Sequence, residues 1–167
     1  MKPETIRDTI RVFEQQPDKA KLKPVVKARS EGAQAILEAG SFIWRADMPP
    51  PLGGTNQAPS PAAQFLGSLA SCAVAFIRDT LAPQLGIRVD SVEATAQCEA
   101  DARGLLGMAG VPPDLDKIQI NIQIDSPDGE AGAQKLYEVW QQRCPVYLAL
   151  IKPMRVATGM QFKRCTG

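Results

Sequence analysis

The chain has 167 residues, 44% of them hydrophobic, and a formal net charge of +1. Its length suits one domain with a sizeable core, and its near-neutral charge gives no electrostatic reason to expect nucleic acid or a membrane as a partner. The absence of histidine excludes Ser–His–Asp and Cys–His catalysis and His-ligated metals within this chain.

The first half of the chain predicts a short helix, three strands and a long loop. Apolar residues at helical spacing, Ile6, Ile10 and Phe13, indicate an amphipathic helix that stops at Pro17. We expect this part, residues 1–20, to be a helical extension of a single domain that spans 1–167. The predicted strands that follow cover 22–30, 33–37 and 42–47. A segment rich in Pro and Gly, MPPPLGGTNQAPSP, then predicts a loop.

The second half begins with a long predicted helix. Ser60 is a good N-cap and Pro61 suits the first helical position, and the pattern runs to about Leu81, with Gly86 as a plausible stop. The predicted strands after it cover 87–98, 117–125 and 154–163, and the predicted helices cover 129–143 and 145–151. Four isoleucines of the second strand share one face: Ile118, Ile120, Ile122 and Ile124. Groups of strands separated by helices favour an α+β fold.

The N-terminal residues, MKPETIRDTIRVFEQQ, are polar and mixed in charge. They lack the apolar core of a secretory signal, so we expect a cytoplasmic protein. Thiols are kept reduced in that compartment, and four scattered cysteines do not indicate a disulfide framework there.

No charged residue occurs from Met48 to Ile77, and Cys72 lies within this stretch. The uncharged part of the helix is shorter and more polar than a membrane span requires. A helix without a polar face is instead typical of a protein interior. Cys72 is therefore predicted to be buried, where a cysteine usually acts as a small hydrophobic residue.

Cys144 has a different local setting because it precedes Pro145 at a predicted helix start. Backbone N–H groups at a helix start stabilise a thiolate, although a buried capping residue explains the same pattern. Cys98 is expected to be a core strand residue and Cys165 an incidental one near the C-terminus. Trp44 and Trp140 are expected to be packing residues.

Together, several segments resemble the OsmC/Ohr family of small dimeric thiol peroxidases, over roughly residues 24–163. The motifs that carry the resemblance are LGGTNQAPSPAAQFLGSLASC (52–72), Gly86-Ile87, RGLLGM (103–108) and CPVYLAL (144–150). The resemblance implies an OsmC-like fold in which long buried helices that bear cysteines are clasped by antiparallel sheets of an intertwined homodimer.

The resemblance also implies a chemistry. Cys72 matches the peroxidatic cysteine, which reduces an organic hydroperoxide or hydrogen peroxide and becomes a sulfenic acid. Cys144 matches the resolving cysteine, which closes a disulfide that an external dithiol reduces. No metal or organic cofactor is implied, and the two cysteines are expected to lie close enough to bridge.

An activating arginine is part of the same resemblance. Arg29 matches it, with Arg45 as the alternative, while Ala62 occupies the position of the glutamate that would hold it. If one of these arginines reaches the thiol, we expect it to be less ordered or to be anchored by another acid, such as Asp47. Two other functions stay open: a dimer that binds a small apolar ligand without turnover, and a redox sensor.

Overall fold

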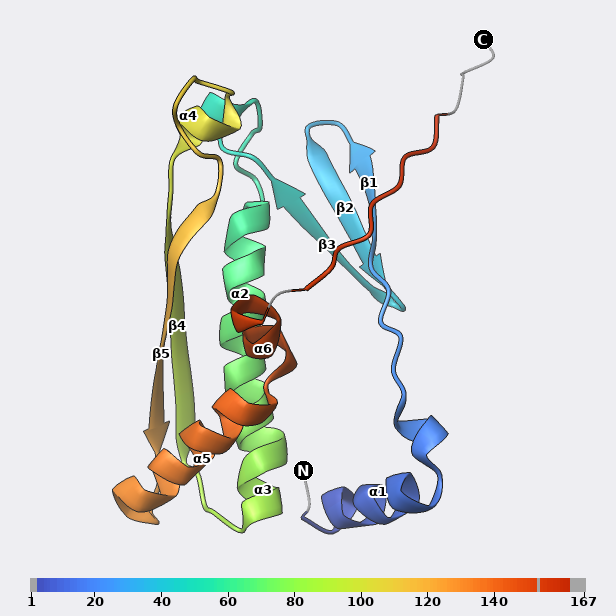
Figure 1. The fold of residues 1–167 in the computed structure, drawn as a ribbon, viewed down its shortest axis with the longest axis vertical. Coiled ribbons are helices and arrows are strands. Elements are labelled where there is room, and N and C mark those ends of the chain that lie inside the picture. The colour runs from blue at the N-terminus through green and yellow to red at the C-terminus, as the bar shows by residue number, and fades with distance from the viewer. Residues whose placement is uncertain (1–2, 153, 163–167) are drawn as a thin grey trace.

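The long helix α2 (Pro61–Phe76) forms the axis of the molecule, with a two-stranded sheet on one side and a three-stranded sheet on the other (Figure 1). The computed structural model describes residues 3–152 and 154–162. The other helices are α1 (Pro3–Gln15), α3 (Ala82–Leu85), α4 (Ala102–Leu105), α5 (Gly129–Arg143) and α6 (Pro145–Ile151), with 3₁₀ turns at Pro17–Ala20 and Pro50–Leu52 and a π turn at Ile77–Leu81. The strands are β1 (Lys27–Glu31), β2 (Gln34–Ala39), β3 (Phe42–Asp47), β4 (Ser91–Ala100) and β5 (Leu115–Asp125).

Both sheets are antiparallel. The strand order is β1-β2-β3 in one sheet and β4-β5 in the other. In the first sheet Arg29 and Arg45 both lie opposite Ile36 of the middle strand. This mixed helical and antiparallel arrangement confirms the predicted α+β class.

The core lies where α2, the π turn, α5 and α6 meet, and the inner faces of β4 and β5 pack against it. Each large apolar side chain that is fully buried contributes about 1.5–3 kcal/mol to folding. The buried residues of this cluster are Leu69, Ala73, Ile77, Leu81, Ala82, Leu136, Val139, Trp140 and Cys144. One end of the core therefore contains Cys144 itself.

The helix that carries Cys72 is longer than predicted. It passes through the π turn, where Ala82 N–H bonds to the carbonyl of Ile77, and continues through α3 to Leu85. The π turn changes the hydrogen-bond spacing just before Pro83, which has no N–H to continue the helical ladder. The helix ends at Gly86, whose φ of +68° is a conformation that favours glycine.

This continuous run, Pro61–Leu85, has 25 residues and is long and apolar enough to cross a membrane by length and composition alone. A core helix passes the same test, and this one packs against β4 and α6. Only 28% of its most apolar stretch is buried inside one chain. The expectation that no membrane is involved therefore stays a prediction. Within one chain, the helix is also covered less completely by the sheets than the sequence suggested.

Three other predictions differ from the structure. The strand expected over 22–30 begins only at Lys27, and residues 154–162 form no regular element where a last strand was expected; Lys163 lies outside the described residues. Ile118 is 36% exposed and is not among the isoleucines of β5 that pack on the core, which are Ile120, Ile122 and Ile124. The regular pairing of β4 with β5 is interrupted beside this residue, by a register shift between Gln97 and Glu99 opposite the region where Lys117 has a φ of +48°.

Candidate functional site

The two cysteines singled out by the sequence, Cys72 and Cys144, lie side by side although they are 72 residues apart. Their Sγ atoms are 3.3 Å from each other, and both thiols are free. This confirms the expected proximity, because a small local movement closes that gap to bonding distance.

Local sequence places each thiol. Ser60 caps α2 by accepting the N–H of Ala63 at 3.2 Å, which fixes the start of the helix three turns before Cys72. At the other thiol, Pro145 disfavours helical backbone in the residue before it. Cys144 accordingly has φ −67° and ψ 114°, so α5 ends there and α6 begins immediately afterwards. Cys144 is thus a junction between two helices, and not a residue inside a long one.

The thiol pair is screened from water to different degrees. Cys144 is 0% exposed, whereas Cys72 is half-buried. Burial raises the pKa of Cys72 from its ordinary 9.0 to about 11, and the neighbouring Cys144 sulfur contributes in the same direction. The backbone N–H of Val146 acts against these effects and lowers the pKa. The start of α6 therefore stabilises the thiolate of Cys72, whereas the sequence had suggested that it would serve Cys144.

The structure does not bring either candidate arginine to the thiols of its own chain. Arg29 binds Glu31 at 2.7 Å and Glu38 at 3.6 Å. Arg45 binds Gln34 at 2.7 Å and Glu31 at 3.3 Å. Neither guanidinium is among the groups that shift the pKa of Cys72. The activating role expected of Arg29 therefore stays a prediction.

Asp47, suggested as an anchor for an arginine at the thiol, has other partners. Asp47 is 3% exposed, and the described part of the chain brings no arginine into a salt bridge with it. Its carboxylate accepts the Thr55 N–H at 3.1 Å, the Thr55 hydroxyl at 2.6 Å and the Gln57 N–H at 3.0 Å. These bonds lower the pKa of Asp47 from 3.8 to about 2. Asp47 holds the loop that leads into α2, and Glu31 is the acid that binds both arginines.

Ala62 lies in the first turn of α2 and is half-buried. The link between this helix and β3 is made by Gln64. Its amide accepts the indole N–H of Trp44 at 3.1 Å and donates to the carbonyl of Arg45 at 2.6 Å. Sequence reasoning did not identify Gln64, because a lone glutamine in an apolar helix carries no recognisable pattern.

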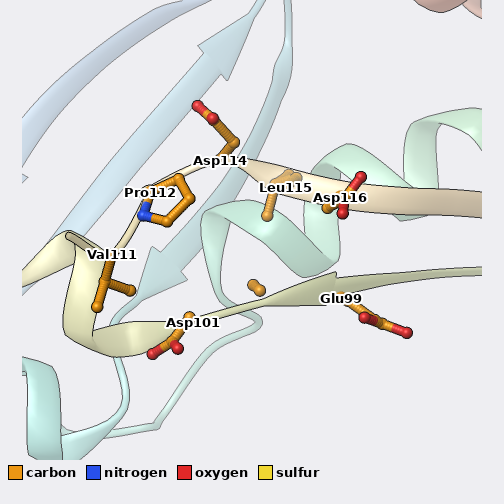
Figure 2. Close-up of a pocket in the computed structure, with 8 residues that line it drawn as sticks. Glu99, Asp101, Val111, Pro112, Asp114, Leu115 and Asp116 are labelled. Carbon is orange, nitrogen blue, oxygen red and sulfur yellow. The ribbon is translucent and has the colours of Figure 1, made fainter.

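A separate cavity of about 420 Å³ lies at the far end of the β4–β5 hairpin (Figure 2). Its lining includes the carboxylates of Glu99, Asp101, Asp114 and Asp116, which Figure 2 labels. Two of them are already paired, Asp101 with Arg103 at 2.6 Å and Glu99 with Lys117 at 2.7 Å. Within residues 3–152 and 154–162, no group of three or more His, Cys, Asp or Glu side chains is arranged to hold a metal ion.

The sequence contains two other cysteines, Cys98 and Cys165. Cys98 is half-buried at the β-strand register shift and is not part of the core, contrary to expectation. Cys165 lies outside the described residues. Trp140 is wholly buried, as expected of a packing residue, but Trp44 is 36% exposed.

Comparisons with known proteins agree on the fold. The matching protein family is described as OsmC-like protein, over residues 54–159, which include both cysteines of the pair. An OsmC-like protein from Mycoplasma pneumoniae superposes with a TM-score of 0.65 at 21% identity, covering 78% of this chain and 88% of the other. None of the curated proteins matches the chain in sequence.

Two solved structures with a described role in resistance are also similar. An organic hydroperoxide resistance protein OsmC from Legionella pneumophila has a TM-score of 0.52 and 24% identity, covering 78% of this chain and 90% of the other. The organic hydroperoxide resistance protein OhrB of Bacillus subtilis has a TM-score of 0.51 and 20% identity, covering 78% and 91%. At these identities the likeness concerns the fold.

Proposed function

Because the chain belongs to the OsmC-like family, and because its fold places two free thiols 3.3 Å apart, we propose that it is a thiol-dependent peroxidase. Its substrates would be organic hydroperoxides or hydrogen peroxide, and an external dithiol would reduce it. The single observation that carries this proposal is the Cys72–Cys144 pair, since a two-cysteine cycle needs both sulfurs within reach of each other.

The cycle has three steps. The thiolate of Cys72 attacks the outer oxygen of the hydroperoxide; the O–O bond breaks, an alkoxide leaves and takes up a proton, and Cys72 becomes a sulfenic acid. Cys144 then attacks the sulfur of Cys72, which forms the disulfide and releases water. The external dithiol reduces the disulfide by thiol–disulfide exchange and is itself oxidised. Cys72 suits the first role because it is the half-buried member of the pair, whereas Cys144 is fully covered.

We further propose that the protein acts as a homodimer. Much of α2 is uncovered within one chain, and β3 exposes Phe42 by 75% and Ile43 by 69%. Exposed apolar surface of this extent is typical of a surface that another chain covers. Arg29 remains our candidate for the activating cation, and we propose that it approaches a thiol only when the dimer forms.

The proposal is tested by dithiol-dependent consumption of cumene hydroperoxide and of hydrogen peroxide. Cys72→Ser should abolish turnover with both substrates, and Cys144→Ser should allow one oxidation but no intramolecular disulfide. Cys98→Ser is the matched control, because it removes a half-buried thiol outside the pair, and it should leave turnover unchanged. Activity that persists in Cys72→Ser would refute the proposal.

A second candidate function is the binding of a small apolar ligand without turnover. The observation that favours it is the raised pKa of Cys72, because a thiol that stays protonated near neutral pH reacts slowly with peroxides. The two candidates differ in the number of oxidant equivalents consumed. With excess dithiol, a ligand-binding protein does not consume hydroperoxide catalytically, whereas a peroxidase turns over until the dithiol is spent.

A further inference from the structure

The two cysteines of the pair differ in how far the chain covers them. Cys144 is 0% exposed, whereas Cys72 is half-buried. The cover over Cys144 comes from its own chain, in the core cluster that includes Leu136 and Trp140. A second copy of the chain can add cover to this side chain but, while the fold is kept, cannot remove any. Cys144 therefore stays enclosed in the monomer and in the proposed dimer.

The neighbours of Cys72 on α2 are small where they face outward. Ser68 lies one turn before it and Ala75 one turn after it, and both are exposed, as is Ser71. Side chains of this size leave room for another molecule to approach α2 at Cys72. The proposed function already needs such a path, because the hydroperoxide must reach this sulfur.

A disulfide between Cys72 and Cys144 would offer an incoming thiolate two sulfurs to attack. The thiolate approaches in line with the S–S bond, from the side opposite the sulfur that leaves. Attack on Cys144 would therefore need space inside the core cluster, where this residue has no exposed surface. Attack on Cys72 comes from the side turned away from Cys144, so access favours Cys72.

The ease with which each sulfur leaves is a second criterion. A thiol with a high pKa is a poor leaving group. The pKa of Cys72 is raised to about 11, first by burial and then by the neighbouring Cys144 sulfur. Attack on Cys144 would expel Cys72 in the first step, which this raised pKa disfavours. Access and leaving-group chemistry thus favour attack on the same sulfur.

We propose that the external dithiol attacks the sulfur of Cys72 and that Cys144 is the first cysteine to be released. This order rests on the proposed function, in which a dithiol reduces the disulfide. One thiolate of the dithiol bonds to the Cys72 sulfur as the Cys72–Cys144 bond breaks, and Cys144 takes up the proton that the dithiol has lost. The second thiol of the dithiol then attacks the dithiol's own bonded sulfur and releases Cys72, which takes up the second proton. The protein gains two electrons and two protons, and the dithiol loses them as it closes its own disulfide.

The last step gives a dithiol an advantage over a monothiol. Cys72 leaves the mixed disulfide reluctantly, because its pKa is high. A second thiol on the same molecule has a high effective concentration at the bond to be broken. A monothiol should therefore reduce the protein more slowly than a dithiol, and its mixed disulfide should form on Cys72.

The test uses protein that is oxidised without a hydroperoxide, so that it does not depend on peroxidase activity. In a Cys98→Ser, Cys165→Ser background, diamide is used to close the Cys72–Cys144 disulfide. The folded protein is mixed with 2-mercaptoethanol, quenched with acid at short times, alkylated in denaturant and analysed by peptide mass spectrometry. Trypsin places the two remaining cysteines on different peptides, because several arginines lie between them in the sequence.

Extrapolated to zero time, the 2-mercaptoethanol adduct should lie on Cys72 at least about tenfold more often than on Cys144, since access differs between the two sulfurs. The same oxidised protein, unfolded in guanidinium chloride before the thiol is added, is the matched control. There the two adducts should agree within about threefold, because burial is lost. Comparable adducts in the folded protein, or an equally strong preference for Cys72 after unfolding, would overturn the proposal, as would a protein in which diamide forms no disulfide. A protein whose adduct lies on Cys72 but that consumes no hydroperoxide would refute only the proposed function.

Discussion

The reactivity of Cys72 should depend steeply on pH. Its pKa is raised from 9.0 to about 11, first by burial and then by the Cys144 sulfur. A thiol is reactive when deprotonated, so a raised pKa lowers the reactive fraction at neutral pH. At pH 7 a pKa of about 11 leaves roughly one thiolate in ten thousand, about a hundredfold less than an ordinary cysteine, since each unit is a factor of ten.

The assay is the rate of iodoacetamide alkylation of Cys72, followed by peptide mass spectrometry from pH 7 to 11. The rate should rise about tenfold per pH unit through pH 10. Cys144→Ala removes the neighbouring sulfur and should lower the midpoint, although burial should keep it above 9.0. A midpoint below about pH 8 would refute the view that one chain alone sets this pKa, because it would require a cation at the thiol, such as Arg29 brought there by the dimer.

Four further predictions test other parts of the structure. Ala62→Glu should change peroxidase turnover at pH 7 by less than about twofold, because both candidate arginines are already bound to Glu31 and a distant surface pair adds little; a tenfold increase would contradict this. Asp47→Ala should lower the melting temperature at pH 7, and the difference from the unmodified protein should shrink as the pH falls toward 2. The reason is the depressed pKa of Asp47 in the folded protein. The ionised carboxylate gives its full stabilisation above about pH 4, and this stabilisation is lost as Asp47 is protonated. Leu136→Ala, at a position that is 0% exposed, should reduce the free energy of unfolding by about 2–5 kcal/mol in urea titrations, and a loss below about 1 kcal/mol would show that this core collapses around the change. Ile43→Arg should weaken self-association in light scattering if the exposed face of β3 is part of the dimer, and an unchanged mass would remove β3 from that interface.

Local sequence signals were sufficient for the elements whose ends are marked by a capping residue or a proline. Ser60 and Pro61 predicted the start of α2, and Pro145 predicted the break between α5 and α6, because each residue imposes its own backbone geometry. The proximity of Cys72 and Cys144 has a different origin. Nothing in a separation of 72 residues indicates contact, and that expectation came from resemblance to a family.

Features that depend on tertiary context were missed. The register shift beside Ile118 arises between two strands, so the regular alternation within one strand could not reveal it. The π turn before Pro83 lets a helix continue where proline usually ends it. The pattern in 154–162 is that of a strand, but a strand forms only with a partner, and the described part of this chain pairs it with none.

The separation of the two thiols along the chain has a thermodynamic consequence. A bond between Cys72 and Cys144 would close a loop of about 72 residues that contains β4, β5 and α5. In the chain-entropy model, a loop of that size stabilises the fold by about 4 kcal/mol, since the cross-link restricts the unfolded chain. By thermodynamic linkage, the folded chain must favour formation of the disulfide, relative to the unfolded chain, by the same free energy. Partial unfolding of this region would make the disulfide easier to reduce, so the tightness of the fold and the resistance of its disulfide to reductant should rise and fall together.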